Sequence, residues 1–141
     1  MLKRFPPKYA SPGDLQSFQL KGLRWTVSHA WNNSPFYRKR LEEARVSPDG
    51  IGTLSDLSRL PFTAAEDLRD NYPLPLLSVP PGEIVRIHSS SGTTGLRKIL
   101  CYTQKDIDDW LYMFARCYEL AGLSREDRVQ ICVGYGLWTA G

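Results

Sequence analysis

Residues 89–95 read Ser-Ser-Ser-Gly-Thr-Thr-Gly, and they lie between two apolar segments, residues 84–87 and 99–102. Hydroxyl groups donate hydrogen bonds, and the two glycines allow the backbone to turn sharply and to approach a ligand closely. Arg97 and Lys98 follow and add positive charge. This pattern is typical of a phosphate-binding loop, but serine, threonine and glycine also dominate plain hairpin turns. Composition alone leaves both interpretations open.

Two common phosphate motifs do not fit this loop. A Walker A loop requires Gly-Lys-Ser/Thr leading into a helix, whereas Gly95 is followed by Leu96 and then by a strand-like segment. The dinucleotide fingerprint Gly-x-Gly-x-x-Gly fails as well, because residue 90 is a serine and no helical pattern follows. The loop therefore matches neither class.

The segments beside the loop predict the start of an α/β domain. Residues 83–88 and 98–103 read as two strands joined in a hairpin-like unit. Thr103, with Asp106 three residues later, is a good helix N-cap, and an apolar stripe at helical spacing then continues as far as Gly122. Residues 124–127 predict a turn and residues 128–133 a buried strand. The alternation of strand, helix and strand is typical of α/β domains.

The N-terminal part predicts helices instead. Residues 1–14 are expected to form an extended arm, and an apolar stripe predicts a helix over residues 15–31, with its tryptophans in the core. Ser34 and Pro35 then cap and open a second helix that reaches Ala44. Capping pairs at Thr53 and Asp56 and at Thr63 and Glu66 predict two shorter helices. We expect three parts: the arm (1–14), a helical segment (15–82), and an α/β part (83–141).

Composition and charge limit the classes of function that we expect for this chain. The chain has 141 residues, of which 42% are hydrophobic and 23% charged, as in ordinary globular proteins. Its net charge of +3 comes from lysines and arginines interleaved with acids, so we expect no nucleic-acid partner. No apolar run approaches the ~18 residues of a membrane span, which predicts a cytoplasmic protein without a membrane partner. Three cysteines cannot all pair, so we expect reduced, buried thiols, and two isolated histidines predict no metal site.

Residues 90–95 resemble the Ser/Thr-Ser-Gly-Thr/Ser-Thr-Gly loop of the adenylate-forming superfamily. The flanking and more distant segments are similar to the phenylacetate-CoA ligase family in particular, over roughly residues 25–141. These segments are residues 34–38, 57–63, 66–73, 86–88, 102–103, 106–110 and 135–137. An ordered series of motifs is more specific than one loop.

The resemblance implies a substrate and cofactors. Such ligases activate a small aromatic carboxylic acid with ATP and Mg²⁺ and then transfer the acyl group to coenzyme A. It implies that the ATP phosphates are bound by Ser90, Ser91, Gly92, Thr93, Thr94, Gly95 and Lys98. Tyr135 and Gly136 match the segment that leads into the acid pocket, although Tyr135 can equally be a core residue. No catalytic residue is assigned.

The chain departs from the family pattern directly after the loop. The family usually has a lysine there, and this chain has Leu96, with Arg97 and Lys98 next. Because a strand alternates faces, only one of these two cations can point at a given phosphate. Lys98 or Arg97 is expected as a partial substitute, and the alternative is that both are solvated charges.

Members of the family are longer, so we expect an N-terminal piece of a ligase, truncated before the rest of the sheet and the small C-terminal domain, and inactive alone. Two alternatives stay open. One is an adenylyltransferase of the same superfamily that acts on another acceptor without coenzyme A. The other is a non-catalytic interaction module that pairs through an exposed sheet edge. A homodimer is also possible.

Overall fold

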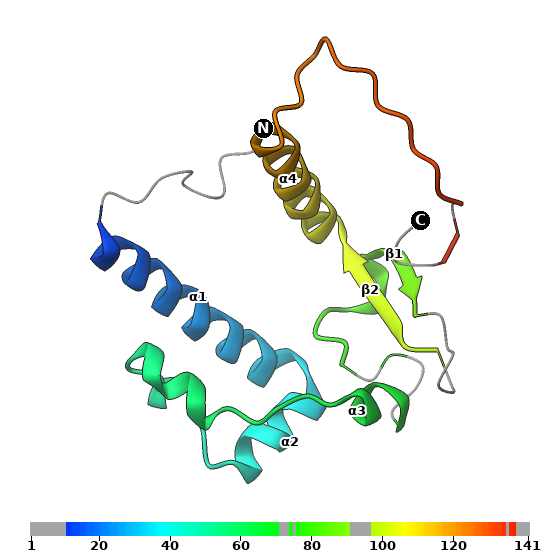
Figure 1. Cartoon of the computed structure of the whole chain (residues 1–141). Helices are drawn as coiled ribbons and strands as arrows, with labels where there is room; N and C mark the ends of the chain where they lie inside the picture. Colours follow the sequence, from blue (N-terminus) through cyan, green and yellow to red (C-terminus); the bar gives the residue numbers. More distant parts are fainter. Residues whose placement is uncertain (1–10, 71–73, 75, 91–96, 135, 138–141) are drawn as a thin grey trace. The chain divides into compact units, whose positions relative to one another are not determined.

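The computed structural model describes residues 11–70, 74, 76–90, 97–134, 136 and 137. These residues fall into two compact units that divide between Pro81 and Gly82. Within this part of the chain, no helix is long and apolar enough to cross a membrane. The helices and strands (Figure 1) are α1 (Pro12–Asn33), α2 (Pro35–Glu43), η1 (Pro48–Gly50), η2 (Leu54–Arg59), α3 (Ala65–Asp70), η3 (Pro81–Glu83), β1 (Ile84–Ser89), β2 (Ile99–Thr103) and α4 (Gln104–Leu120), where η denotes a 3-10 helix.

Helix α1 begins earlier than its apolar stripe predicts. Ser11 is the N-cap, its hydroxyl oxygen accepts a hydrogen bond from the Asp14 amide at 3.1 Å, and Pro12 opens the first turn. A proline costs nothing at this position, because its missing amide hydrogen would have no partner there. Residues 12–14 are therefore helical and not part of an extended arm. Residues 1–10 of the predicted arm lie outside the described residues.

The core of the helical unit lies between α1, α2 and the segment that follows them. Its buried members are Val27, Leu41, Val46 and Ile51. Ser34 and Pro35 cap and open α2 as predicted. The prediction that Trp25 is a core residue is wrong, because its side chain is 60% exposed and stacks on His29. Trp25 precedes Val27 by two positions, about 200° around the helix, and so faces away from the core.

The two short helices predicted after α2 both form, but the helix type of the first and the cap of the second differ from the prediction. The Thr53 and Asp56 capping box is present, but the segment it opens, η2, is a 3-10 helix. Helix α3 begins at Ala65, and the carboxylate of Asp67 accepts a hydrogen bond from the Ala64 amide at 2.7 Å. Thr63 instead hydrogen-bonds through its hydroxyl to the hydroxyl of Tyr37, at 3.0 Å. The predicted box of Thr63 and Glu66 is therefore replaced by a cap from Asp67.

The second unit is built on an antiparallel hairpin and one helix. Strand β1 pairs with β2, with Ile87 opposite Cys101 and His88 opposite Leu100. Thr103 caps α4 through the predicted capping box with Asp106. Gly122, at a φ of 85°, follows the helix in the left-handed conformation that glycine adopts readily. The hairpin, the helix and its end match their predictions.

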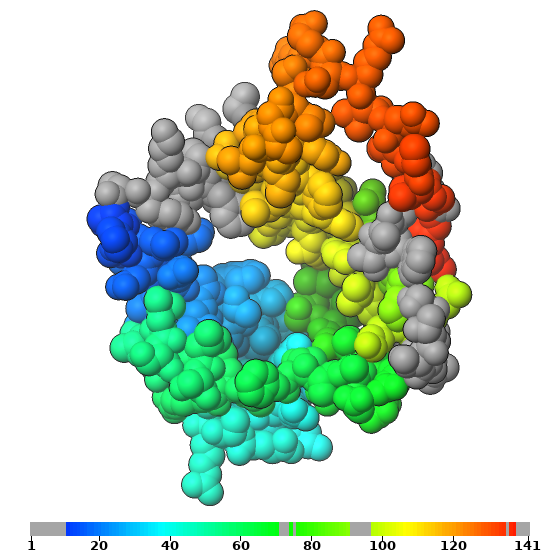
Figure 2. Space-filling model, in the orientation of Figure 1, coloured from blue at the N-terminus to red at the C-terminus, as the bar shows by residue number. Residues whose placement is uncertain are grey.

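The prediction of a buried strand over residues 128–133 is wrong. These residues form no strand, and the side chains of Val129, Ile131 and Val133 are exposed. Figure 2 shows them as a thin strip, orange to red. A strand requires a neighbour that takes up its backbone hydrogen bonds, and no described segment pairs with this one. Cys132 is exposed with it, as is Cys117 on α4, and Cys101 is only partly buried, so the prediction of buried thiols is wrong for Cys117 and Cys132.

Candidate functional site

The base of the Ser/Gly/Thr loop is closed by two hydrogen bonds between the same pair of residues. The Ser90 amide donates to the Lys98 carbonyl oxygen at 3.0 Å, and the Lys98 amide donates to the Ser90 hydroxyl oxygen at 3.0 Å. They continue the hairpin one step beyond the end of β1. Within the described part of the chain the Ser90 hydroxyl accepts this one bond and donates none, so its own hydrogen is left for a further acceptor.

The register of the hairpin separates the two cations that follow the loop. Successive residues of a strand face opposite sides, and residues directly opposite each other share a side. His88 lies opposite Leu100, and Ser90 pairs with Lys98, so these residues share one face. Arg97 precedes Lys98 by one position and falls on the other face. Lys98 is therefore the cation placed beside Ser90.

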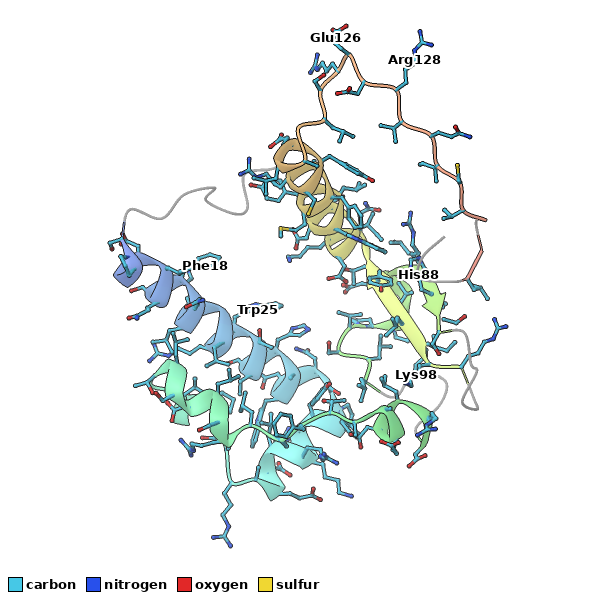
Figure 3. All side chains as sticks on the ribbon, viewed as in Figure 1. Phe18, Trp25, His88, Lys98, Glu126 and Arg128 are labelled. Atoms are coloured by element: carbon cyan, nitrogen blue, oxygen red, sulfur yellow. The ribbon has the colours of Figure 1, made fainter. Side chains whose placement is uncertain are left out.

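The face that carries His88 is covered by aromatic side chains. The His88 ring lies edge-on to Tyr102, with centroids 5.1 Å apart, and to Trp110 of α4, with centroids 5.6 Å apart. Tyr102 and Trp110 stack on each other at 5.5 Å. The side chain of His88 is labelled in Figure 3. Helix α4 thus positions the histidine that directly precedes the serine run.

Two buried polar atoms lie at the end of β1. His88 is 4% exposed, and the neighbouring Ser89 is also buried. Within the part of the chain that the structure describes, neither the Nδ1 atom of His88 nor the Oγ atom of Ser89 has a hydrogen-bond partner. Buried polar atoms are satisfied in the large majority of cases, so each exception calls for an explanation. The sequence places His88 directly before the serine run and contains no signal for this unpaired nitrogen.

The segment after residue 134 approaches the same end of β1. The backbone amide of Ser89 donates a hydrogen bond to the carbonyl oxygen of Leu137. Gly136 directly precedes this residue, so the structure brings one predicted acid-pocket residue close to the base of the predicted phosphate loop. The other predicted site residues lie outside the described residues: Ser91, Gly92, Thr93, Thr94, Gly95 and Tyr135.

The charged residues directly after the loop, Arg97 and Lys98, are cationic. On the face opposite to that of His88, burial raises the pKa of the Cys101 thiol above its usual value and keeps it protonated. Among the described residues, no three histidine, cysteine, aspartate or glutamate side chains cluster as they would around a metal ion. The described part of the site thus offers hydroxyl, amide and ammonium donors, which suit an anionic ligand.

Comparison with known proteins was made by sequence and by structure. No protein-family model matches the chain. The chain is 46% identical over 136 residues to the phenylacetate-coenzyme A ligase of Escherichia coli strain K12, and it is equally similar to that of Pseudomonas putida. Both matches cover 96% of this chain. The chain is thus homologous to phenylacetate-coenzyme A ligases over nearly all of its own length. It spans 31% of the length of these two ligases.

Solved structures of acyl-CoA ligases share the fold. The 2-hydroxyisobutyryl-CoA ligase in an open conformation, with 2-HIB-AMP and CoA, matches with a TM-score of 0.60 and 25% identity. The same ligase in the thioesterification state matches with a TM-score of 0.62 and 28% identity, over 77% of this chain and 25% of that one. The predicted fold, a helical segment followed by the start of an adenylate-forming ligase domain, is confirmed.

Proposed function

We propose that this chain is the N-terminal part of an ATP-dependent ligase that joins an aryl-acetic acid to coenzyme A. A carboxylate oxygen of the acid attacks the α-phosphate of ATP, the bond between the α- and β-phosphates breaks, and pyrophosphate leaves. The thiol of coenzyme A, losing its proton, then attacks the acyl carbon and AMP leaves. The observation that carries this proposal is the 46% identity to phenylacetate-coenzyme A ligases over 96% of the chain.

The loop would bind the phosphates of ATP. Among the described residues the Ser90 hydroxyl donates to no partner, and Lys98 lies on the same face of the hairpin. Hydrogen bonds from charged donors to ionised oxygens are shorter and stronger than neutral ones. We assign the phosphate contacts to Ser90, Ser91, Gly92, Thr93, Thr94, Gly95 and Lys98. Leu96 stands where the family usually has a lysine, and Lys98 would supply the positive charge instead.

The acid would bind beside Gly136. A Cβ atom added at this glycine would meet no described atom within 4 Å, so a ligand has room to approach the backbone there. The hydrogen bond from Ser89 to Leu137 holds this segment close to the end of β1. A carboxylate at Gly136 would thus be near a phosphate at Ser90, which is what attack on the α-phosphate requires. Tyr135 belongs to the same proposed pocket.

The remaining partners follow from the reaction. Coenzyme A is the proposed acyl acceptor. The described residues contain no carboxylate cluster for Mg²⁺, so we assign that ion no ligand in this chain.

Three free cysteines support a reducing compartment, the cytoplasm. The homodimer stays a prediction that size-exclusion chromatography with light scattering would check.

The test uses a complete enzyme that carries this chain. We expect pyrophosphate exchange into ATP that depends on phenylacetate, followed by consumption of coenzyme A. Replacing Lys98 by alanine should lower the exchange rate about tenfold or more, the value of one hydrogen bond to a charged group, whereas Arg97→Ala is the matched control. Exchange that no carboxylic acid stimulates would refute the ligase function. Exchange without consumption of coenzyme A would instead favour another acceptor.

A second measurement addresses the 141-residue chain alone. Isothermal titration with ATP and Mg²⁺ should give a Kd weaker than ~1 mM, because the chain spans less than a third of the relatives' length. Tight binding would show that the main nucleotide contacts lie within this chain.

A further inference from the structure

His88 is the buried histidine of the hairpin, and one of its ring nitrogens makes no hydrogen bond to the described residues. The side chain is 4% exposed, and Nδ1 has no hydrogen-bond partner among the described residues. Removing a polar atom from water without giving it a partner is unfavourable, so such atoms are rare in folded proteins. A ligand atom that reaches this nitrogen would remove that penalty.

The other histidine of the chain shows the usual arrangement. His29 has its Nε2 atom 3.2 Å from the Ser78 hydroxyl and its Nδ1 atom 3.2 Å from the Asn33 side-chain amide. Both ring nitrogens of His29 are therefore satisfied within the helical unit. An unpaired nitrogen is thus a particular feature of His88.

The orientation of the His88 ring is fixed by its neighbours. Tyr102 and Trp110 contact it edge-on and also stack on each other. The ring cannot turn its free nitrogen toward solvent without breaking these contacts. Groups that are held in place before a ligand arrives bind it with a smaller loss of entropy.

The position of His88 connects it with the proposed phosphate site. It precedes Ser90 by two residues, so both lie on the face of the hairpin that also holds Lys98. A neutral imidazole that carries its hydrogen on Nδ1 can donate to an anionic oxygen. We propose that His88 is a further ligand-binding residue, whose Nδ1 donates a hydrogen bond to an anionic oxygen of the bound substrate.

This proposal rests on the proposed function, because it places the ligand at the same loop. Two sources of the oxygen share the required chemistry, a phosphate of ATP and the carboxylate of the acid. A buried water at Nδ1 is the competing explanation, and it would satisfy the nitrogen without any ligand.

The test is an NMR titration of the ¹⁵N-labelled chain with two probes, sodium pyrophosphate and phenylacetate, each raised to about 50 mM because the expected Kd is weaker than ~1 mM. We expect pyrophosphate to shift the Nδ1 resonance of His88 together with the amides of Ser90 and Lys98, and to leave His29 unchanged. A shift with phenylacetate alone would support the proposal with the carboxylate as the source.

Two outcomes would overturn it, and they differ in what else they refute. If the Ser90 and Lys98 amides shift while His88 does not, the phosphate site stands and His88 is not part of it. If no hairpin resonance responds to either probe, the site itself is refuted together with the role of His88.

A pair of substitutions separates ligand contact from structural support. The amide of His88→Asn lies close to the position of Nδ1, and that of His88→Gln lies close to the position of Nε2. We expect His88→Asn to bind the probe that shifts the His88 resonance with an affinity within about threefold of the wild type. His88→Gln should lose about tenfold in affinity, as for one hydrogen bond to a charged group. Equal losses, with unchanged circular dichroism, would contradict a role for Nδ1.

Discussion

Ser90 and Lys98 hold each other through two hydrogen bonds, one between their backbones and one from the Lys98 amide to the Ser90 hydroxyl oxygen, both 3.0 Å long. A serine of the predicted phosphate loop thus has a structural task at the base of the hairpin. The same contact places Lys98 beside Ser90. The Ser90 side chain therefore contributes both to the closure of the loop and to the placement of its cation.

Replacing Ser90 by alanine should therefore lower the stability of the chain. The Lys98 amide loses its partner in a partly buried position, which costs about 1 kcal/mol of unfolding free energy. Urea denaturation followed by circular dichroism measures this change. Ser58→Ala removes an exposed hydroxyl that donates to the Ser55 carbonyl oxygen, and it should change the free energy by less than about 0.5 kcal/mol. Equal effects of the two substitutions would contradict the structural task of Ser90.

The core of the helical unit is small, and Leu41 is central to it. Leu41 is 4% exposed, whereas Leu57 on η2 is 61% exposed. Leu41→Ala should cost about 2–5 kcal/mol of unfolding free energy, because it removes buried methyl groups and leaves a cavity. Leu57→Ala, the same change at the surface, should cost less than about 0.5 kcal/mol. Thermal and urea unfolding of both variants checks this, and similar midpoints would place the core elsewhere.

Asp56 makes stability depend on pH in the acid range. Hydrogen bonds from the Thr53 amide, the Arg59 side chain and the Gly52 amide lower the pKa of this carboxyl from 3.8 to about 2. The folded state thus holds its proton less tightly than the unfolded state does. The contribution of Asp56 is complete above a pH of about 4, and it is lost as the pH falls through about 2.

The substitution Asp56→Asn tests this linkage. The difference in unfolding free energy between the wild type and Asp56→Asn should shrink as the pH falls from about 5 to about 2. Urea denaturation at several pH values measures it, and Asp49→Asn, at an exposed aspartate of η1, is the control. A difference that stays constant over this range would show that Asp56 acts through packing and not through its charge.

The three cysteines should react with thiol reagents at different rates. Cys117 and Cys132 are exposed, whereas Cys101 is partly buried and burial raises the pKa of its thiol. Because the thiolate is the reactive form, Cys101 should be labelled at least about tenfold more slowly than Cys117 and Cys132. Mass spectrometry of the chain after brief labelling measures this, with labelling in urea as the control. Rapid labelling of Cys101 in the folded chain would contradict the packing of β2.

Local sequence signals predicted most elements of the fold correctly. Ser34 and Pro35 open α2, the Thr103 and Asp106 box opens α4, and Gly122 follows the end of α4. Each of these signals acts between residues at most four positions apart, so no distant segment is needed to establish it. The hairpin was also predictable, because its two strands are near neighbours in the chain.

The errors concern residues whose state depends on distant segments. Trp25 and Val27 are both apolar and two positions apart, and only the packing of α2 and its neighbours against α1 makes one exposed and the other buried. Residues 128–133 have the composition of a strand, but composition does not supply the partner that a strand requires. Within the candidate site, the sequence left Lys98 and Arg97 as alternatives and contained no signal for the unpaired nitrogen of His88.

The sequence by itself determined the resemblance to phenylacetate-coenzyme A ligases and the caps of α2 and α4, because these follow from neighbouring side chains and from an ordered series of motifs. Only the tertiary structure decided that Lys98 and not Arg97 shares a face with Ser90, that Leu137 bonds to Ser89, and that His88 is buried with a free nitrogen. These properties depend on the register of β1 and β2, on the packing of α4 against them and on the approach of Leu137, and none of these follows from the side chains of adjacent residues alone.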